Sequence, residues 1–193
     1  MPRTKTFNEQ VVLEKAMHLF WAKGYHATSI QDLVSHLGVN RASLYGTFGG
    51  KHELFEKSLQ HYRALNGLAF EQFLAQEEDV KEGLRTLFRR AIQEAKEDST
   101  QKGCFFVNTT TELIPNDPKI CACVQENRQY VERVFEQFLQ KGIKNGQLSP
   151  NHNTKASATF LFTFYSGLRV LTKTSFEETH LYQVIDEMIE RLA

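Results

Sequence analysis

The chain has 193 residues, 41% of them hydrophobic and 24% charged, and its 23 basic and 23 acidic side chains cancel. This composition is typical of a globular protein with a sizeable core, and the net charge by itself gives no support for nucleic-acid binding. The longest apolar stretch, residues 160–171, is interrupted by Thr163, Ser166, Gly167 and Arg169, which excludes a membrane span and a membrane partner.

The cysteines and the N-terminal residues predict a reduced, cytoplasmic protein. Cys104, Cys121 and Cys123 are an odd number without a disulfide pattern. The segment Met1–Lys5 is polar and leads into a predicted helix, so no signal peptide is expected.

Charge is distributed unevenly along the chain. Residues 1–63 carry 8 Lys/Arg against 5 Asp/Glu, and the other 15 Lys/Arg and 18 Asp/Glu follow later. The first segment therefore has a charge of +3 and the rest −3, which is consistent with one end of the protein facing DNA.

The first predicted helix spans residues 8–23, where apolar residues recur at helical spacing and Gly24 ends the pattern. The second begins at Thr28, which we expect to be its N-cap because Gln31 follows at the spacing of a capping box. It ends at Gly38, a residue that tolerates the left-handed conformation of a helix C-terminus.

A third, short helix is predicted from Asn40, a good N-cap, to the break at Gly49-Gly50. Two short helices joined by a turn that contains glycine form a helix-turn-helix, the unit that places its second helix in the DNA major groove. Fewer than fifty residues make a thin core, so we expect a fourth helix to brace the first three.

Helical periodicity continues to the end of the chain and predicts an all-α protein without repeats. The further helices are expected at residues 51–75, 80–97, 104–113, 119–141, 154–173 and 178–192. The helix at 154–173 is apolar almost all round, and the last one has a regular apolar stripe. This pair has more apolar surface than a small monomer buries, which indicates a four-helix interface in a homodimer.

Residues 8–55 resemble the DNA-binding domain of TetR-type transcriptional repressors. The resemblance rests on a first helix ending in Gly-Tyr, on Thr28-Ser29-Ile30, Leu37-Gly38-Val39, Leu44-Tyr45 and Phe48, and on Lys51 followed by Leu54-Phe55. It implies an N-terminal three-helix DNA-binding domain at residues 1–50 and a helical regulatory and dimerisation domain at 51–193. It also implies a dimer that binds a near-palindromic operator.

The resemblance further implies which residues meet DNA. Thr28 is expected at a phosphate, the recognition helix is expected to supply most contacts, and Lys51 is expected beside the DNA backbone. The DNA-binding residues expected in this way are Thr28, Asn40, Arg41, Ala42, Ser43, Tyr45 and Lys51. Gly46 and Thr47 stand where relatives often have larger side chains, so base reading is expected to depend on Arg41, Ser43 and Tyr45.

The many phenylalanines of the second domain suggest a mostly apolar pocket for an unidentified small-molecule inducer, with a few polar contacts. The predicted ligand-binding residues are Phe70, Phe73, Phe88, Cys104, Phe105, Asn108, Thr111, Phe135, Phe162 and Tyr165. The plainer interpretation of each aromatic residue is a core position.

Cys104 permits an alternative, in which oxidation or alkylation of a thiol releases the protein from DNA. No metal site is expected at Cys121-Ala122-Cys123, because residues two apart on a helix do not face each other. The sequence has no phosphate loop, nucleophile elbow or His-Glu metal motif, so neither an enzyme nor a cofactor is predicted. A small Cys-dependent hydrolase is a remote alternative, and a pure interaction module is another.

Overall fold

The computed structural model describes residues 7–192, which form nine α-helices and no strand, as the all-α prediction requires. The helices are α1 (Glu9–Lys23), α2 (Ile30–Leu37), α3 (Arg41–Phe48), α4 (Lys51–Gln76), α5 (Val80–Glu97), α6 (Phe105–Leu113), α7 (Pro118–Lys144), α8 (Thr154–Leu171) and α9 (Glu178–Glu190). Within residues 7–192, no helix combines the length and hydropathy of a membrane span. The polar segment Met1–Lys5 lies outside the described residues.

The start of α2 differs from the sequence-based expectation by one residue. Ser29 is the N-cap, and it exchanges hydrogen bonds with Asp32 in a capping box. Thr28 is fully buried and donates its hydroxyl proton to the Gly24 carbonyl at 2.6 Å. Its side chain therefore closes the turn after α1, and the Thr28–Gln31 cap predicted from spacing is wrong.

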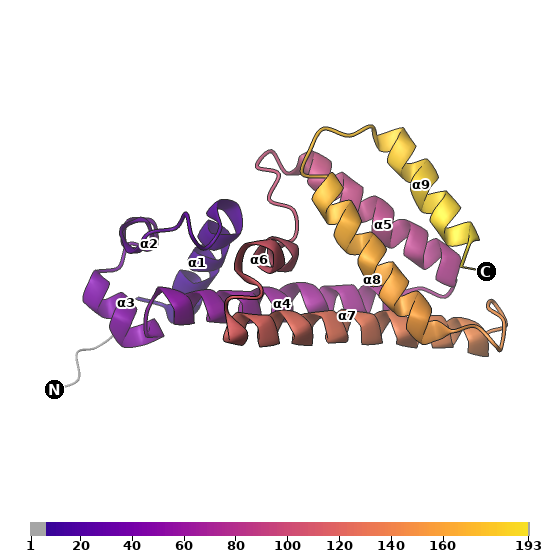
Figure 1. Ribbon diagram of the computed structural model, residues 1–193, viewed down its shortest axis with the longest axis horizontal. Helices are drawn as coiled ribbons and strands as arrows, with labels where there is room; N and C mark the ends of the chain where they lie inside the picture. The colour runs from indigo at the N-terminus through magenta and orange to yellow at the C-terminus, as the bar shows by residue number, and fades with distance from the viewer. Residues whose placement is uncertain (1–6, 193) are drawn as a thin grey trace.

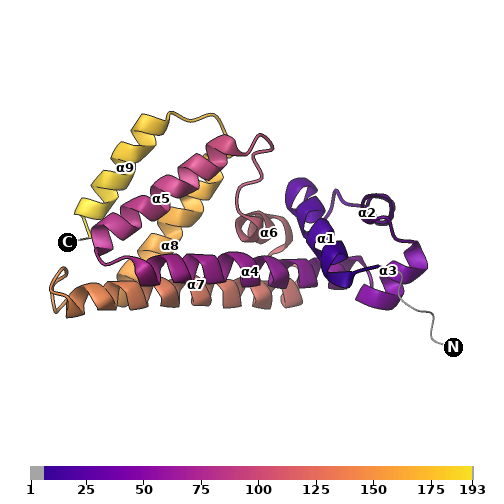
Figure 2. The same ribbon diagram turned by 180° about the vertical axis from the view of Figure 1, so that it is seen from behind.

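Two long helices, α4 and α7, lie side by side and form the axis of the molecule (Figures 1 and 2). They run in the same direction, because His52 contacts Asp117 at their N-terminal ends and Lys141 bonds to the Ala75 carbonyl near their C-terminal ends. We call α1–α3, at one end of this axis, the head. Helices α5, α8 and α9 cover the other end, and α6 lies between them and the head.

One hydrophobic cluster holds the head together and extends beyond it. It joins Phe20 of α1, Leu44 of α3, Phe55 of α4 and Phe105 of α6, all at most 2% exposed. The predicted bracing of the head by a fourth helix is confirmed. A domain boundary between residues 50 and 51 remains a prediction, and this cluster crosses it.

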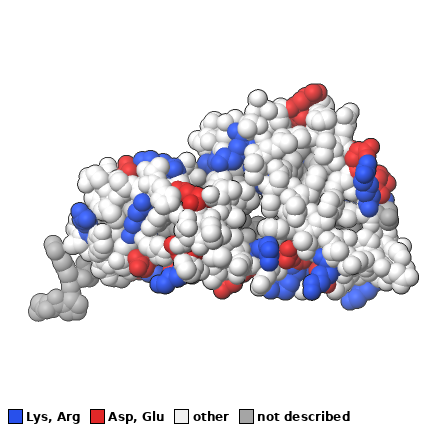
Figure 3. Space-filling view, in the orientation of Figure 1, with Lys and Arg blue, Asp and Glu red and all other residues white. Residues whose placement is uncertain are grey.

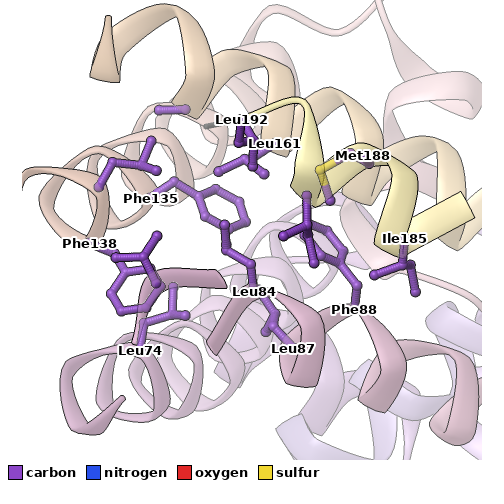
Figure 4. Packing of buried hydrophobic residues seen from close by; sticks show 14 of the residues in the cluster. Leu74, Leu84, Leu87, Phe88, Phe135, Phe138, Leu161, Ile185, Met188 and Leu192 are labelled. Carbon is purple, nitrogen blue, oxygen red and sulfur yellow. The ribbon is translucent and has the colours of Figure 1, made fainter. Parts of the chain in front are cut away.

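A second cluster lies at the opposite end of the axis, between α4, α5, α7, α8 and α9. Figure 4 shows its side chains converging from these helices, with Phe88, Phe135 and Leu161 among those without solvent exposure. Helix α6 belongs to the head cluster through Phe105, Phe106 and Leu113.

Candidate nucleic-acid interface and internal cavity

Helix α3 is fixed to the head by one face and exposes the other. Its N-cap, Asn40, accepts a hydrogen bond from the Ser43 backbone N–H at 2.8 Å. Leu44 and Phe48 are buried in the head cluster. Arg41, Ala42 and Tyr45 are exposed, and Ser43 is half-buried. The helix is thereby held rigidly with a short polar face available to a partner.

Arg41 and Tyr45 come together on this exposed face. The Arg41 guanidinium carbon lies 5.7 Å from the centroid of the Tyr45 ring, and Tyr45 is 42% exposed. A guanidinium group held on an aromatic ring keeps its donors free for phosphate oxygens or guanine edges. Gly46, next on the helix, is exposed and leaves open space beside the pair.

The start of α2, the first helix of the helix-turn-helix, is held in place by an ion pair. Asp32 forms an ion pair with Lys23 at 3.1 Å across the turn between α1 and α2. Hydrogen bonds from the backbone and side chain of Ser29, and then the Lys23 contact, lower the pKa of Asp32 to about 2. The carboxylate is therefore ionised at neutral pH and holds the start of α2.

Thr28 and Lys51, both expected at DNA phosphates, have partners within the chain. The buried Thr28 hydroxyl already has a partner in the Gly24 carbonyl, and a phosphate contact at this position remains a prediction. The Lys51 ammonium lies 4.2 Å from the centroid of the Tyr25 ring, and partial burial lowers its pKa. Lys51 is half-buried at the start of α4, and its contact with DNA remains a prediction.

A cavity of about 270 Å³, partly open to solvent, lies between α4, α6, α7 and α8. Its lining is predominantly apolar, and the described residues around it include no acidic side chain. The lining residues are Tyr62, Arg63, Asn66, Gly67, Phe70, Cys104, Phe106, Val107, Thr110, Thr111, Val124, Asn127, Val131, Phe162, Tyr165 and Ser166. Burial raises the pKa of the Tyr165 hydroxyl to about 12, so this side chain is neutral at physiological pH.

The cavity contains part of the predicted ligand-binding set. Phe70, Cys104, Thr111, Phe162 and Tyr165 line it. Cys104 is the N-cap residue of α6 and is half-buried. Binding of a ligand by these residues remains a prediction.

The other predicted ligand-binding residues lie elsewhere. Phe88 and Phe135 pack against each other in the second cluster, with ring centroids 6.4 Å apart and no exposure. Phe105 packs in the head cluster, and the centroid of its ring lies 5.5 Å from that of Phe55. These three residues do not line the cavity, because the number of aromatic residues on a helix does not indicate which neighbour each ring faces.

Two further members of the predicted set have other partners. The Arg90 guanidinium lies 4.3 Å from the centroid of the Phe73 ring, which is outside the cavity. The Asn108 amide donates to the Lys102 carbonyl at 2.7 Å and accepts from the Lys173 ammonium at 3.0 Å. Phe73 and Asn108 therefore have structural contacts and do not line the cavity.

Sequence reasoning missed several polar lining residues, notably Tyr62, Asn127 and Ser166. Burial raises the pKa of Tyr62 well above its ordinary value. Asn127 lies between Val124 and Val131 on the apolar side of α7. A polar residue within an apolar stripe is the sequence feature that could have identified it as a lining residue.

No group of three or more His, Cys, Asp or Glu side chains within residues 7–192 has the arrangement of a metal site. Cys121 and Cys123 are free thiols, the first half-buried and the second buried. Nothing in the described part of the chain therefore supports a role for this pair in metal binding.

Two family models match the chain over separate ranges. Residues 12–57 match the family described as bacterial regulatory proteins, tetR family. Residues 81–188 match the C-terminal domain described as tetracyclin repressor-like. The first range contains α2 and α3 together with most of α1, and the second contains α6, α7 and α8, which line the cavity together with α4.

Curated relatives are similar over almost the whole chain. The HTH-type transcriptional regulator YezE of Bacillus subtilis (strain 168) is 30% identical over 187 residues, which is 96% of each protein. The HTH-type transcriptional repressor ComR of Escherichia coli (strain K12) is 30% identical over 94% of this chain and 87% of its own.

Solved structures share the fold. A cysteine mutant of the TetR family regulator CifR, complexed with 26-bp double-strand operator DNA, has a TM-score of 0.87 and 26% identity, covering 97% of this chain and 98% of that one. These relatives are regulators, which contradicts the remote alternative of a Cys-dependent hydrolase. Sequence, fold and relatives thus lead to one conclusion: the chain belongs to the TetR family of bacterial transcriptional regulators.

Proposed function

We propose that the protein is a homodimeric cytoplasmic repressor that binds a near-palindromic operator through α3 and is released by a small, largely apolar ligand. The observation that carries the DNA-binding part is the exposed pair of Arg41 and Tyr45 on a capped helix anchored by Leu44 and Phe48. Two relatives support it, since ComR is described as a repressor and the CifR mutant is described as complexed with operator DNA.

The outer face of α8 supports the dimer. Phe160 is 47%, Val170 50% and Leu171 46% exposed, and Gly167 lies between them with open space beside it. Figure 3 shows mainly uncharged surface over the middle of α8. On α9, Val184 is 37% exposed. Burying these side chains against the same helices of a second chain gives the four-helix contact expected from the sequence.

The chemistry of the cavity indicates which ligands it accepts. Among the described residues, the lining includes no carboxylate to balance a cationic ligand, and its one cationic side chain, Arg63, is paired with Glu126 at 3.0 Å. Asn127 of α7 and Ser166 of α8 contribute an amide and a hydroxyl to an otherwise mostly apolar wall. We therefore expect an uncharged, mostly apolar ligand with one polar group that meets Asn127 or Ser166.

A neutral fluorescent probe tests this expectation. N-phenyl-1-naphthylamine is expected to bind with saturable enhancement of its fluorescence, because it is apolar and carries one hydrogen-bonding group. Asn127→Trp fills the cavity from α7 and should weaken the probe's binding about tenfold or more. Gln125→Trp, on the exposed side of the same helix, should leave binding unchanged. Equal binding by both variants would show that the probe occupies another site.

A second candidate mechanism is favoured by the position of Cys104, which lines the cavity at the start of α6. An electrophile that enters the cavity is then brought to this thiol. In a protein that carries Cys121→Ser and Cys123→Ser, alkylation with iodoacetamide is expected to weaken operator binding about tenfold. Fluorescence anisotropy of labelled DNA measures the effect. Release that persists after Cys104→Ser is added would contradict the thiol mechanism.

A further inference from the structure

The side chain of Glu112 connects α6 to the head. Its carboxylate accepts a hydrogen bond from the Tyr25 backbone N–H at 3.0 Å and another from the His26 backbone N–H at 2.7 Å. Both amides belong to the turn between α1 and α2. A carboxylate shared by two N–H groups forms charge-assisted bonds, which are short and strongly directional.

The turn is shaped to receive this carboxylate. Gly24 ends α1 with φ +85°, a conformation that side chains other than glycine rarely adopt. A Cβ atom at this position would lie 3.0 Å from Glu112 Oε2. The absence of a side chain at Gly24 therefore permits both the backbone conformation and the close approach of Glu112.

Helix α6 contacts the cavity and the head at the same time. Phe106, Val107 and Thr111 line the cavity, and Thr111 directly precedes Glu112. Phe105 lies on the head side, in edge contact with Phe55. An occupant that pushes against α6 therefore displaces the carboxylate that holds the α1–α2 turn.

The other end of this connection is the helix-turn-helix. His26 lies three residues before Ser29, the N-cap of α2, and α2 packs against α3. A separate contact, between His52 of α4 and Asp117 at the start of α7, joins the head end of the two long helices without α6. The position of the head relative to α6 is thus determined in part by the two bonds of Glu112.

We propose that Glu112 is a positioning residue that transmits the state of the cavity to the DNA-binding helices. The proposal rests on the proposed function, because it needs a cavity whose occupancy controls operator binding. Hydrogen bonds weaken steeply when their geometry changes, so a small displacement of α6 is enough to alter how the turn is held. Helix α6 with Glu112 is then a two-state element, with the bonds to the turn made or broken, and both the cavity and the head affect its equilibrium.

A double-mutant cycle tests the coupling without a known inducer. The indole of Asn127→Trp fills the cavity from α7 and so imitates a permanently bound ligand. The indole of Ser166→Trp fills the same cavity from α8. Each filling variant is combined with Glu112→Gln, which keeps the volume of the side chain but removes its charge. It is also combined with Glu112→Ala, which removes both oxygen atoms that accept hydrogen bonds from the turn. Circular dichroism verifies the fold, and anisotropy gives the operator affinity of every protein.

When Glu112 is present, filling the cavity is expected to weaken operator binding about tenfold. In the Glu112 variants, the same filling substitution should reduce operator affinity by less than about threefold. Glu126→Gln is the matched control, since this carboxylate pairs with Arg63 and does not contact the α1–α2 turn; it should leave the filling effect at about tenfold. A merely structural role for Glu112 would change stability equally in filled and unfilled proteins.

Two results would overturn the proposal, and they are distinguishable. If filling weakens operator binding equally with and without Glu112, the cavity controls DNA binding by another route and the proposed function stands. If filling has no effect in either background, the inducible function fails and the coupling by Glu112 fails with it.

Discussion

Replacing Tyr45 with alanine is expected to weaken specific operator binding at least about thirtyfold while the protein stays folded and keeps its oligomeric state. Tyr45 is exposed and lies outside the head core, so its removal leaves no cavity. It also carries the Arg41 guanidinium on its ring. A good side-chain contact to a base contributes about 1–3 kcal/mol, and a dimer uses each contact twice. The sum of about 2–6 kcal/mol corresponds to a loss of at least about thirtyfold in affinity.

Anisotropy of a labelled operator fragment measures this loss, and thermal unfolding verifies that the variant is folded. Tyr45→Phe is the informative companion, because it keeps the ring beneath Arg41 and removes only the hydroxyl. Retained affinity in Tyr45→Phe assigns the role to the ring, and lost affinity assigns it to the hydroxyl. An unchanged affinity of Tyr45→Ala would show that the assigned interface is wrong.

Phe160→Asp is expected to convert the proposed dimer to a monomer. The substitution places a charge at an exposed apolar position on α8, and burying an unpaired carboxylate in a helix–helix contact is strongly unfavourable. A monomer reads one half-site only, so the gain from linking two heads is lost. That gain is commonly about a hundredfold or more. Sedimentation equilibrium measures the mass, and anisotropy measures the accompanying loss of operator affinity.

Leu65→Asp is the matched control for the dimer prediction. Leu65 is 50% exposed, similar to Phe160, but it lies on α4, away from the proposed contact. This variant should remain dimeric and bind operator normally. A dimer that survives Phe160→Asp would place the contact between protomers on a different surface.

Helix positions could be predicted well because caps, glycines and prolines act locally. The helix Val80–Glu97 agrees with its predicted range, and Pro118 begins α7 after the turn that was expected there. The failure at Thr28 is instructive. Thr28 and Ser29 are both good caps by composition, and the choice between them depends on the Gly24 carbonyl that the Thr28 hydroxyl reaches in the folded chain.

The cavity could be predicted only in part, because its lining depends on how helices rotate about their axes. Phe105 and Phe106 are adjacent and both belong to the head cluster, yet only Phe106 also lines the cavity. Phe70 lines the cavity while Phe135 packs behind it, with ring centroids 5.2 Å apart. The contact of Glu112 with Tyr25 and His26 joins residues more than eighty positions apart, and no local pattern indicates it.

Operator binding by two chains is tested most directly by a titration of the DNA upstream of the protein's own gene, measured by anisotropy at several salt concentrations. Two chains are expected to bind one near-palindromic site, and the same fragment with scrambled half-sites is expected to bind far more weakly. If Arg41 and Lys51 each contact a phosphate in both heads, about four contacts are made. A plot of the logarithm of the binding constant against the logarithm of the salt concentration should then have a slope of about −4. Equal affinity for the scrambled fragment, or affinity that does not change with salt, would contradict operator binding by two chains.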